Sequence, residues 1–471
     1  MKRILTMAWR NIWRNKRRTL ITIASIFFAV FFAVIMRSFQ LGTYDHMIHQ
    51  SIESFSGYIQ IQNQEFFYDP NIDNSFEYNQ ELISKVNDVD NIKIAVPRVE
   101  SFALASTGVQ SKGVLVTGID PQKEEKLSDP ENRLVNFRFS PDIVQDILSS
   151  VDLPEKQKEL LKSNNKKSYS SLSRISLDLD LDKDLEEKLF PVVKEKASFK
   201  SNYLKSNDDG VLVSDRLAKY LNAHVGDTIV LIGSGYHGRS AANVFPVRGI
   251  VKLLSPDLDN KLVYMTLSQA QDYFSLGNRI TSLNINLDDT DEMYETQEDL
   301  RRVVGNDNFS VKNWEEFNPT MKQQIEGDSV GGIIFIGILY FIVLFGIIGT
   351  VLMMISERER ELGVMIAIGM SKIKLSMVLI IEMLFLGVIG TLTGLLASVP
   401  IVIIGNKNPI KMTGELAKMF EDMGFDPVMP LAWFDQYFVW QGVIIMIMVI
   451  IACYLPLRRV RRMKVVNALR A

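Results

Sequence analysis

Few residues of this 471-residue chain show the spacing that catalysis or metal binding requires. The aspartates alternating through 178–184 suggest a calcium loop, but its glycine and terminal glutamate are absent, which favours a solvated strand or loop face. His46 and His49, three residues apart, give only a weak metal signal. No nucleophile with a base can be proposed from spacing. We therefore predict no catalytic residue, no metal site and no cofactor bound by this chain.

The sequence also lacks a G-x-x-x-x-G-K-[ST] motif, the glycine-rich loop that holds nucleotide phosphates. We therefore do not expect the chain to be an enzyme that hydrolyses ATP through such a loop. No nucleic-acid partner is expected either.

The most informative segment is SERERELGVMIAIGMSKIKL, Ser356–Leu375. Ser356 can cap a helix whose first turn carries three glutamates, which the helix dipole favours at that end. The apolar run Leu362–Ile368 is too short to span a membrane and too apolar to be left in water. Gly369 can end this helix and Ser371 can cap the next. Such a helix requires a partner groove, unless it packs back into the membrane interface.

Four apolar segments determine the fold class, because each approaches the roughly 20 residues that cross a hydrocarbon core. Only one Asp, Glu, Lys, Arg or His residue, Glu382, lies inside any of them. We predict an α-helical membrane protein with four transmembrane helices and a large α+β extracytoplasmic domain inserted between helices one and two. The segments are Thr19–Met36, Val330–Ile355, Ser376–Ile404 and Val439–Leu457.

Charge predicts the orientation of these helices. The two ends of the chain and the 356–375 segment together hold 17 basic and three acidic residues, although the net charge of the chain is −3. Short loops rich in Lys and Arg remain in the cytoplasm. We therefore predict that both termini are cytoplasmic and that the large domain and the 405–438 loop lie outside.

The predicted boundaries follow from these patterns and from turn signals. They are 1–18, a cytoplasmic amphipathic interfacial helix; 19–42, transmembrane helix 1; 43–325, the extracytoplasmic domain, with core halves 43–120 and 245–325 around an inserted subdomain at 121–244; 326–355, transmembrane helix 2; 356–375, a cytoplasmic segment; 376–404, transmembrane helix 3; 405–438, an outer loop; 439–457, transmembrane helix 4; and 458–471, a basic cytoplasmic tail.

Three further patterns predict contacts. The glycine-rich turn at Ile232–Val244 is a candidate partner hairpin, or only a turn; its residues are Gly235, Tyr236, His237 and Gly238. In the outer loop, residues at helical spacing predict an amphipathic helix that lies on the outer leaflet or caps the bundle: Leu416, Met419, Phe420 and Met423. In the third span, small residues predict close packing against another helix: Gly387, Gly390 and Gly394.

The pattern E-R-x-R-E-[IL]-G-x-x-x-A-x-G-x-S, met in Ser356–Leu375, resembles the coupling segment of FtsX-like ABC transporter permeases. Ala8–Asn11 and Asn15–Thr19 resemble the start of the same family, and Leu217-Ala218 followed by Val225–Asp227 resembles its outer domain. The resemblance implies these ATPase-coupling residues: Glu357, Arg358, Arg360, Glu361, Leu362, Gly363, Ala367, Gly369 and Ser371.

The resemblance also implies partners. It implies two copies of a separate ATPase subunit, which would bind ATP and Mg, and a second permease, identical or homologous. The chain looks most similar to the lipoprotein-releasing (Lol-type) permease subunits, because it lacks a fused ATPase domain and has a large outer domain. A bacterial cytoplasmic (inner) membrane location follows, with the large domain in the periplasm.

On this resemblance, the expected function is ATP-driven extraction of lipoproteins from the outer leaflet for transfer to a periplasmic carrier. The alternatives are a non-transporting mechanotransmission permease that regulates an extracytoplasmic enzyme, export of a periplasmic small molecule or peptide, and a receptor with a membrane anchor. An acylated cargo needs an apolar site open to membrane lipids. The candidates are Phe28, Phe31, Phe32, Ile35, Met36, Ile333, Ile334 and Gly337.

Overall fold

The computed structural model describes residues 2–14, 16–305, 308–412, 419 and 428–462. The chain divides into two compact units. A helical unit comprises the residues up to His46, Lys322–Met412 and the described residues from Val428 on. An α/β unit comprises Met47–Met321.

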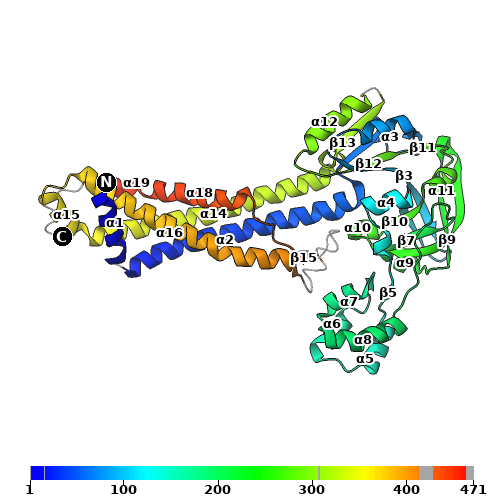
Figure 1. The fold of residues 1–471 in the computed structure, drawn as a ribbon, viewed down its shortest axis with the longest axis horizontal. Coiled ribbons are helices and arrows are strands. Elements are labelled where there is room, and N and C mark those ends of the chain that lie inside the picture. Colours follow the sequence, from blue (N-terminus) through cyan, green and yellow to red (C-terminus); the bar gives the residue numbers. More distant parts are fainter. Residues whose placement is uncertain (1, 15, 306–307, 413–418, 420–427, 463–471) are drawn as a thin grey trace. The chain divides into compact units, whose positions relative to one another are not determined.

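Long apolar helices build the helical unit (Figure 1). The helices at Lys16–Ile48, Pro319–Glu357, Lys372–Lys407 and Gln436–Ala452 are apolar all round, as expected for helices surrounded by other helices or by lipid. The unit also contains a two-stranded ribbon, Ile410–Lys411 (β14) with Val428–Met429 (β15). The helices are α1 (Lys2–Arg14), α2 (Lys16–Ile48), α14 (Pro319–Glu357), α15 (Glu359–Ala367), α16 (Lys372–Lys407), α18 (Gln436–Ala452) and α19 (Tyr454–Arg462).

Three helices of the described chain are long and apolar enough to cross a membrane: Thr19–Ser56, Pro319–Glu357 and Lys372–Lys407. The fourth predicted span, 439–457, is divided at Cys453 between α18, an apolar helix of 17 residues, and α19. At about 1.5 Å per residue, α18 alone is shorter than a hydrocarbon core of about 30 Å. The count of four spans therefore stays a prediction.

The glycine strip of α16 packs inside the helical unit. A Cβ added at Gly390 would lie 2.7 Å from the Ile26 Cβ, and one at Gly394 would lie 2.9 Å from the Phe27 carbonyl oxygen. A Cβ at Gly387 would lie 3.2 Å from a Val449 methyl. Helices α2 and α18 thus approach α16 where it has no side chains, which confirms the predicted close packing and places it within one chain.

Helix α1 packs on protein. Its Ala8 and Ile12 are buried, and the Trp9 ring meets the Phe385 ring of α16 edge-on, 5.6 Å between centroids. The helix ends at Arg14, before the predicted boundary at residue 18. Trp9 and Trp13 stay about half exposed.

A nine-stranded sheet with the order β13-β1-β12-β3-β4-β10-β7-β9-β8 organises the α/β unit. The long strand β3 also pairs with β8, so the strands from β3 to β8 in this order close into a ring. The strands are β1 (Ile59–Asn63), β3 (Ile92–Ser106), β4 (Ser111–Ile119), β7 (Val211–Ser214), β8 (Thr228–Ser234), β9 (Ser240–Val251), β10 (Leu262–Thr266), β12 (Ser282–Leu287) and β13 (Phe309–Asn313).

Helices and a small ribbon complete this unit. The ribbon joins β2 (Phe76–Glu77) to β11 (Arg279–Ile280). A π-helix, η1 (His49–Ser56), continues the chain from α2. The helices are α3 (Gln80–Asn87), α4 (Pro121–Leu127), α9 (Asp215–Leu221), α10 (Pro256–Asp259), α11 (Leu267–Tyr273), α12 (Met293–Val304) and α13 (Trp314–Phe317), with the 3₁₀ turns η2 (Ile72–Asn74), η3 (Glu131–Arg133) and η4 (Tyr236–Gly238).

The inserted subdomain is shorter than the predicted 121–244. A separate hydrophobic core runs only from Phe139 to Ala197, whereas β7, β8 and β9 belong to the main sheet. Strand β7 pairs with β10, β8 pairs with β3, and β9 pairs with both β7 and β8, so these strands cannot be part of the insertion. The subdomain consists of α5 (Pro141–Ser150), α6 (Glu155–Ser163), α7 (Leu172–Leu179), α8 (Lys183–Lys196), β5 (Phe137–Arg138) and β6 (Ser168–Tyr169).

Two further sequence patterns are the predicted helix of the outer loop and the alternating aspartates. The predicted amphipathic helix of the outer loop lies outside the described residues, apart from Met419, which is exposed. The alternating aspartates act locally: Asp182 caps α8, and Asp180 forms an ion pair with Lys156. No group of three or more metal-ligating side chains occurs among the residues that the structure describes.

Candidate coupling site

The coupling segment is a helix–break–helix unit. Helix α14 continues to Glu357, and Arg358 (φ −101°, ψ 8°) separates it from α15. Ser356 therefore lies in the last turn of α14, and the prediction that it caps a new helix is wrong. The apolar helix α14 continues past Ser356, so α15 begins later, after Arg358, and without a side-chain cap.

The other end of α15 follows the prediction. Gly369 has φ +104°, and the Met370 N–H donates to the Met365 carbonyl at 3.0 Å, so a left-handed glycine ends the helix. The Ser371 hydroxyl then accepts the Lys374 N–H at 3.4 Å and begins α16. Both local assignments are confirmed. A rigid turn thus connects α15 to the third long helix.

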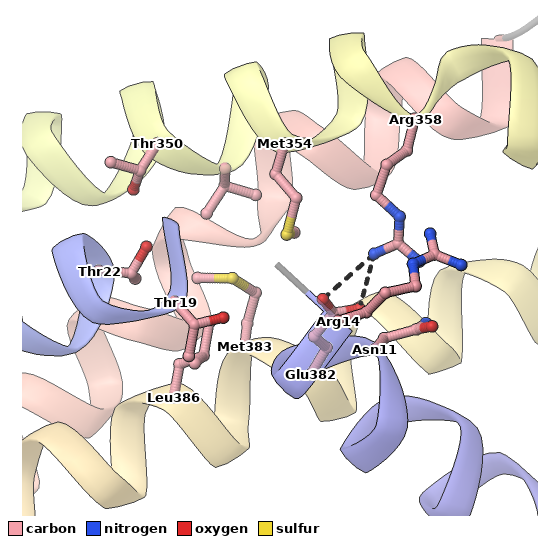
Figure 2. A pocket seen from close by; sticks show the side chains of 11 residues that line it. Asn11, Arg14, Thr19, Thr22, Thr350, Met354, Arg358, Glu382, Met383 and Leu386 are labelled. Atoms are coloured by element: carbon pink, nitrogen blue, oxygen red, sulfur yellow. Dashed lines mark hydrogen bonds and ion pairs between the residues drawn. The ribbon is translucent and has the colours of Figure 1, made fainter. Parts of the chain in front are cut away.

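A buried ion pair lies at the base of this unit. The Arg358 Nη1 is 3.2 Å from both carboxylate oxygens of Glu382, and the two side chains are 8% and 3% exposed (Figure 2). Glu382 is the single acidic or basic residue of the predicted spans, and its partner comes from the coupling motif itself. A buried carboxylate without a cation would be costly, so this pair fixes the start of α15 against α16.

A second ion pair ties α1 to α15. Arg14 donates to Glu361, and the Arg358 Nε lies 3.5 Å from the same carboxylate. Partial burial opposes ionisation of Glu361, but hydrogen bonds and charge from Arg14 and Arg358 outweigh it, so the pKa of Glu361 lies below its ordinary value. Glu361 is therefore charged at neutral pH. Three elements, α1, α15 and α16, are linked through two arginines and two carboxylates.

Two hollows adjoin these pairs. Figure 2 shows the first, where Thr19 and Thr22 of α2 and Thr350 of α14 line the space beside Glu382. The second is an open groove of about 550 Å³ between α1, α15 and α16. Its lining residues are Met7, Asn11, Arg14, Arg358, Arg360, Glu361, Leu362, Val364, Met365, Leu375, Val378 and Leu379.

The coupling residues point in different directions. Leu362 and Gly363 are buried, whereas Val364 is 40% exposed and Ile368 is 82% exposed. A helix cannot present alternate residues on one face, so Leu362 anchors α15 while Val364 and Ile368 face outward. Ala367 is also exposed. The docking role of these residues stays a prediction.

The candidate cargo residues lie on two helices. Phe28 and Phe32 are each 51% exposed, and Ile333 and Ile334 are exposed to a similar degree. Phe31, Ile35 and Met36 are half-buried, and Gly337 has open space beside it. Neither hollow described above touches these residues. Their cargo role stays a prediction.

Polar contacts also connect α2 to α14, next to the candidate cargo residues on both helices. The Gln40 amide donates to the Asp328 carbonyl at 2.8 Å, and the Tyr44 hydroxyl donates to the Asp328 carboxylate at 2.7 Å. Gly332 lies against the Gln40 side chain. These contacts close the space between the two helices at this level.

The candidate partner hairpin is held against its own unit. The Tyr236 N–H donates to the Phe274 carbonyl at 2.8 Å, and the Arg279 guanidinium lies 5.2 Å from the centre of the Tyr236 ring. Gly235 is buried, so only His237 and Gly238 are exposed at the tip. A partner role for this hairpin stays a prediction.

Sequence reasoning missed Asn11, Arg14 and the role of Glu382. The sequence did contain a signal for Glu382. A single carboxylate in an apolar segment requires a cation close to it, near the end of that segment. Arg14 gave no comparable signal, since it is one of seven basic residues before the first span.

Comparisons with known proteins find similarity over part of this chain. Residues 333–465 match the FtsX-like permease C-terminal family. The lipoprotein-releasing system transmembrane protein LolC of Xylella fastidiosa is 21% identical over 201 residues, 42% of this chain and 48% of that protein. LolC of Neisseria meningitidis serogroup B is 22% identical over 194 residues, 40% and 47% of the two chains. The chain thus spans about half the length of these relatives.

More distant likenesses extend the comparison. An uncharacterized ABC transporter permease of Methanocaldococcus jannaschii is 22% identical over 162 residues, 33% of this chain and 40% of that protein. The extracellular domain of the ABC-type transporter YknZ from Gram-positive bacteria gives a TM-score of 0.29 at 13% identity, covering 55% of this chain and 100% of that one. The periplasmic region of MacB from Actinobacillus actinomycetemcomitans gives 0.29 at 17% identity, covering 58% and 94%.

Proposed function

We propose that this chain, which carries an FtsX-like permease domain at residues 333–465, is the membrane subunit of an ATP-driven ABC complex. The observation that carries the proposal is the ion-paired base of α15. Arg358 and Glu361 belong to the coupling motif. The buried partner Glu382 fixes the start of the helix against α16, and the exposed pair with Arg14 adds a weaker contact to α1. A helix held at its start in this way can pass a force to α14 and α16.

The outward face of α15 is the proposed docking surface for a separate ATPase. Ile368 is 82% exposed beside the left-handed turn at Gly369. An apolar side chain this exposed at a helix end fits a groove on another protein. In this proposal the partner supplies the nucleotide site with ATP and Mg, and two copies act on two permeases.

A co-purification experiment tests the docking. The chain is expressed with candidate ABC ATPase subunits from its own genome, and Ile368→Asp is compared with wild type. We expect the variant to insert in the membrane but to lose the ATPase and its stimulated activity. Val109→Asp is the matched control, because Val109 is 93% exposed in the α/β unit. Retention of a fully active ATPase by the Ile368 variant would refute the docking assignment.

We further propose that the cargo is an acylated protein in the outer leaflet of the bacterial inner membrane, passed to a periplasmic carrier. The likeness to LolC supports this cargo, because those relatives are lipoprotein-releasing proteins by name. The exposed phenylalanines Phe28 and Phe32 and the isoleucines Ile333 and Ile334 give an acyl chain an apolar surface.

Photo-crosslinking tests the cargo separately from the docking. Crosslinkers at Phe32 and Ile334 should capture lipoprotein in nucleotide-free membranes and lose it when ATP is added. Phe345 on α14, 57% exposed, is the matched control position. Crosslinks only to neighbouring helices, in a complex with normal ATPase activity, would reject the cargo and favour regulation of an extracytoplasmic enzyme.

A further inference from the structure

The open groove between α1, α15 and α16 has two kinds of wall. More than half of its lining residues are apolar, among them Met7, Leu362 and Leu375, and the basic ones are Arg14, Arg358 and Arg360. Its volume of about 550 Å³ is in the range of ordinary ligand sites. A wholly apolar ligand would leave Arg360 without a counter-charge, and a small soluble anion would leave the apolar wall wet. The groove therefore suits an amphiphile with an anionic head.

The arginines differ in how firmly they are engaged. Arg358 is buried and committed to Glu382. Arg14 is 54% exposed and shares Glu361, which is itself 51% exposed. Arg360 is exposed, and within the described ranges it makes no ion pair. An exposed ion pair is worth about 0–1 kcal/mol, so a phosphate can take Arg14 from Glu361 at little cost.

The position of the groove identifies the amphiphile. Its lining includes Arg358, which directly follows α14, and Leu375, Val378 and Leu379 at the start of α16, so it lies where the long apolar helices begin and end. On α1, Met7, Asn11 and Arg14 line the groove, and on the other side of the helix Trp9 and Trp13 are 45% and 52% exposed, as is typical of residues at headgroup depth. Guanidinium groups bind phosphate through paired N–H donors.

We propose that this groove binds one anionic phospholipid, with Arg14 and Arg360 on its phosphate and the start of its acyl chains against the apolar wall. The lipid then bridges α1 and α15, the same two helices that the Arg14–Glu361 pair joins. The proposal requires no ATPase, so it stands or falls independently of the proposed function.

Native mass spectrometry of the full-length chain in detergent tests this site. Delipidated protein is titrated with phosphatidylglycerol or phosphatidylcholine, and bound lipid is counted. We expect one phosphatidylglycerol to bind more tightly than any phosphatidylcholine. Arg360→Gln should weaken that binding about tenfold, the effect of one lost charged hydrogen-bonded contact, and Arg360→Lys should weaken it less. Arg14→Gln should act in the same direction.

The control is Lys374→Gln, which removes an exposed basic residue near the groove but not in its lining. It should leave phosphatidylglycerol binding unchanged. Equal binding of the two lipids, or binding that Arg360→Gln does not alter, would overturn the proposal. Displacement of phosphatidylglycerol by inorganic phosphate at constant ionic strength would identify a soluble anion as the ligand and equally overturn it.

Discussion

Arg358 and Glu382 face each other across the turn that separates the second and third long helices, with one guanidinium nitrogen 3.2 Å from both carboxylate oxygens. Both side chains are almost fully buried. A motif residue of the coupling segment is thus paired with the one carboxylate of the apolar spans. The pair links the sequence that resembles a coupling helix to the core of the helical unit.

This pair should be more important for geometry than for stability. Glu382→Leu leaves the buried Arg358 with only its longer contact to Glu361, 3.5 Å away, and we expect a loss of about 3–5 kcal/mol, visible as a lower melting temperature in detergent. The double variant Arg358→Met/Glu382→Leu should recover most of that loss, because an apolar pair can replace a buried ion pair. Its stimulated ATPase activity should nevertheless stay low.

The double variant separates the two roles. If it melts like wild type and also couples like wild type, then the ion pair does not position α15. If it melts as low as the single variant, the pair is not the reason for the single variant's instability.

Gly369 should tolerate substitution only by residues that can adopt its positive-φ backbone conformation. Its φ is +104°, and an added Cβ would meet nothing within 4 Å, so the penalty is conformational and not steric. Gly369→Val should abolish stimulated ATPase activity, and Gly369→Asn should retain part of it, because Asn accepts left-handed backbone.

Gly108 is a matched control for this prediction. It has φ +89° and equally open surroundings, but it lies in the β3–β4 turn of the α/β unit. Gly108→Val introduces similar strain away from the coupling segment. If it reduced ATPase stimulation as much as Gly369→Val, general instability would be the cause.

Local signals predicted much of the helical unit. Gly369 ends α15 through its own backbone conformation, and Ser371 caps α16 through a bond to a neighbouring residue. Both helix boundaries can therefore be predicted from the local sequence. The strip of Gly387, Gly390 and Gly394 predicted close packing, because few other roles suit three small residues on one face of an apolar helix.

Long-range pairing was the part that sequence could not supply. Ser356 has a capping residue's chemistry, yet α14 continues through it. Glu382 and Arg358 are 24 residues apart on two helices, and only the turn at Gly369 brings them together. In the α/β unit, the charged composition of the insertion ends before β7, but the pairing of β7, β8 and β9 with distant strands decides where the subdomain stops.

Asp259 should give the α/β unit a pH-dependent stability. It is buried, and it accepts N–H groups of Leu253 at 3.0 Å and Asp215 at 3.2 Å. Burial raises the pKa of Asp259 to about 6 from 3.8. The folded state therefore binds the proton more tightly than the unfolded chain. The stabilisation is full below about pH 4 and is lost as the pH rises through 6, by up to about 3 kcal/mol.

Hydrogen exchange of the full-length protein measures this effect. Protection of the peptide that covers α9 should fall between pH 4 and pH 7, after correction for intrinsic exchange. Asp259→Asn keeps an acceptor oxygen but cannot ionise, so it should remove the fall. Burial raises the pKa of the neighbouring Asp215, but Lys219 and Arg138 lower it by more, so this pKa lies below its ordinary value. Ionisation of Asp215 therefore changes stability with pH in the opposite direction, and it does so in both the wild type and the variant. An unchanged slope in the variant would reject Asp259 as the titrating group.

Gly390 should be intolerant of any side chain. Even a Cβ there would lie 2.7 Å from the Cβ of Ile26, and both belong to helix backbones that cannot move independently. Gly390→Ala should therefore destabilise the helical unit by about 1–3 kcal/mol through overpacking, and Gly390→Ile by more. Gly337→Ala is the control, because nothing lies within 4 Å of its added Cβ and alanine favours the helix. Melting temperatures in detergent should fall for the Gly390 variants and stay level or rise for Gly337→Ala. Equal melting of the two alanine variants would mean that α2 does not approach α16 as closely as the structure shows.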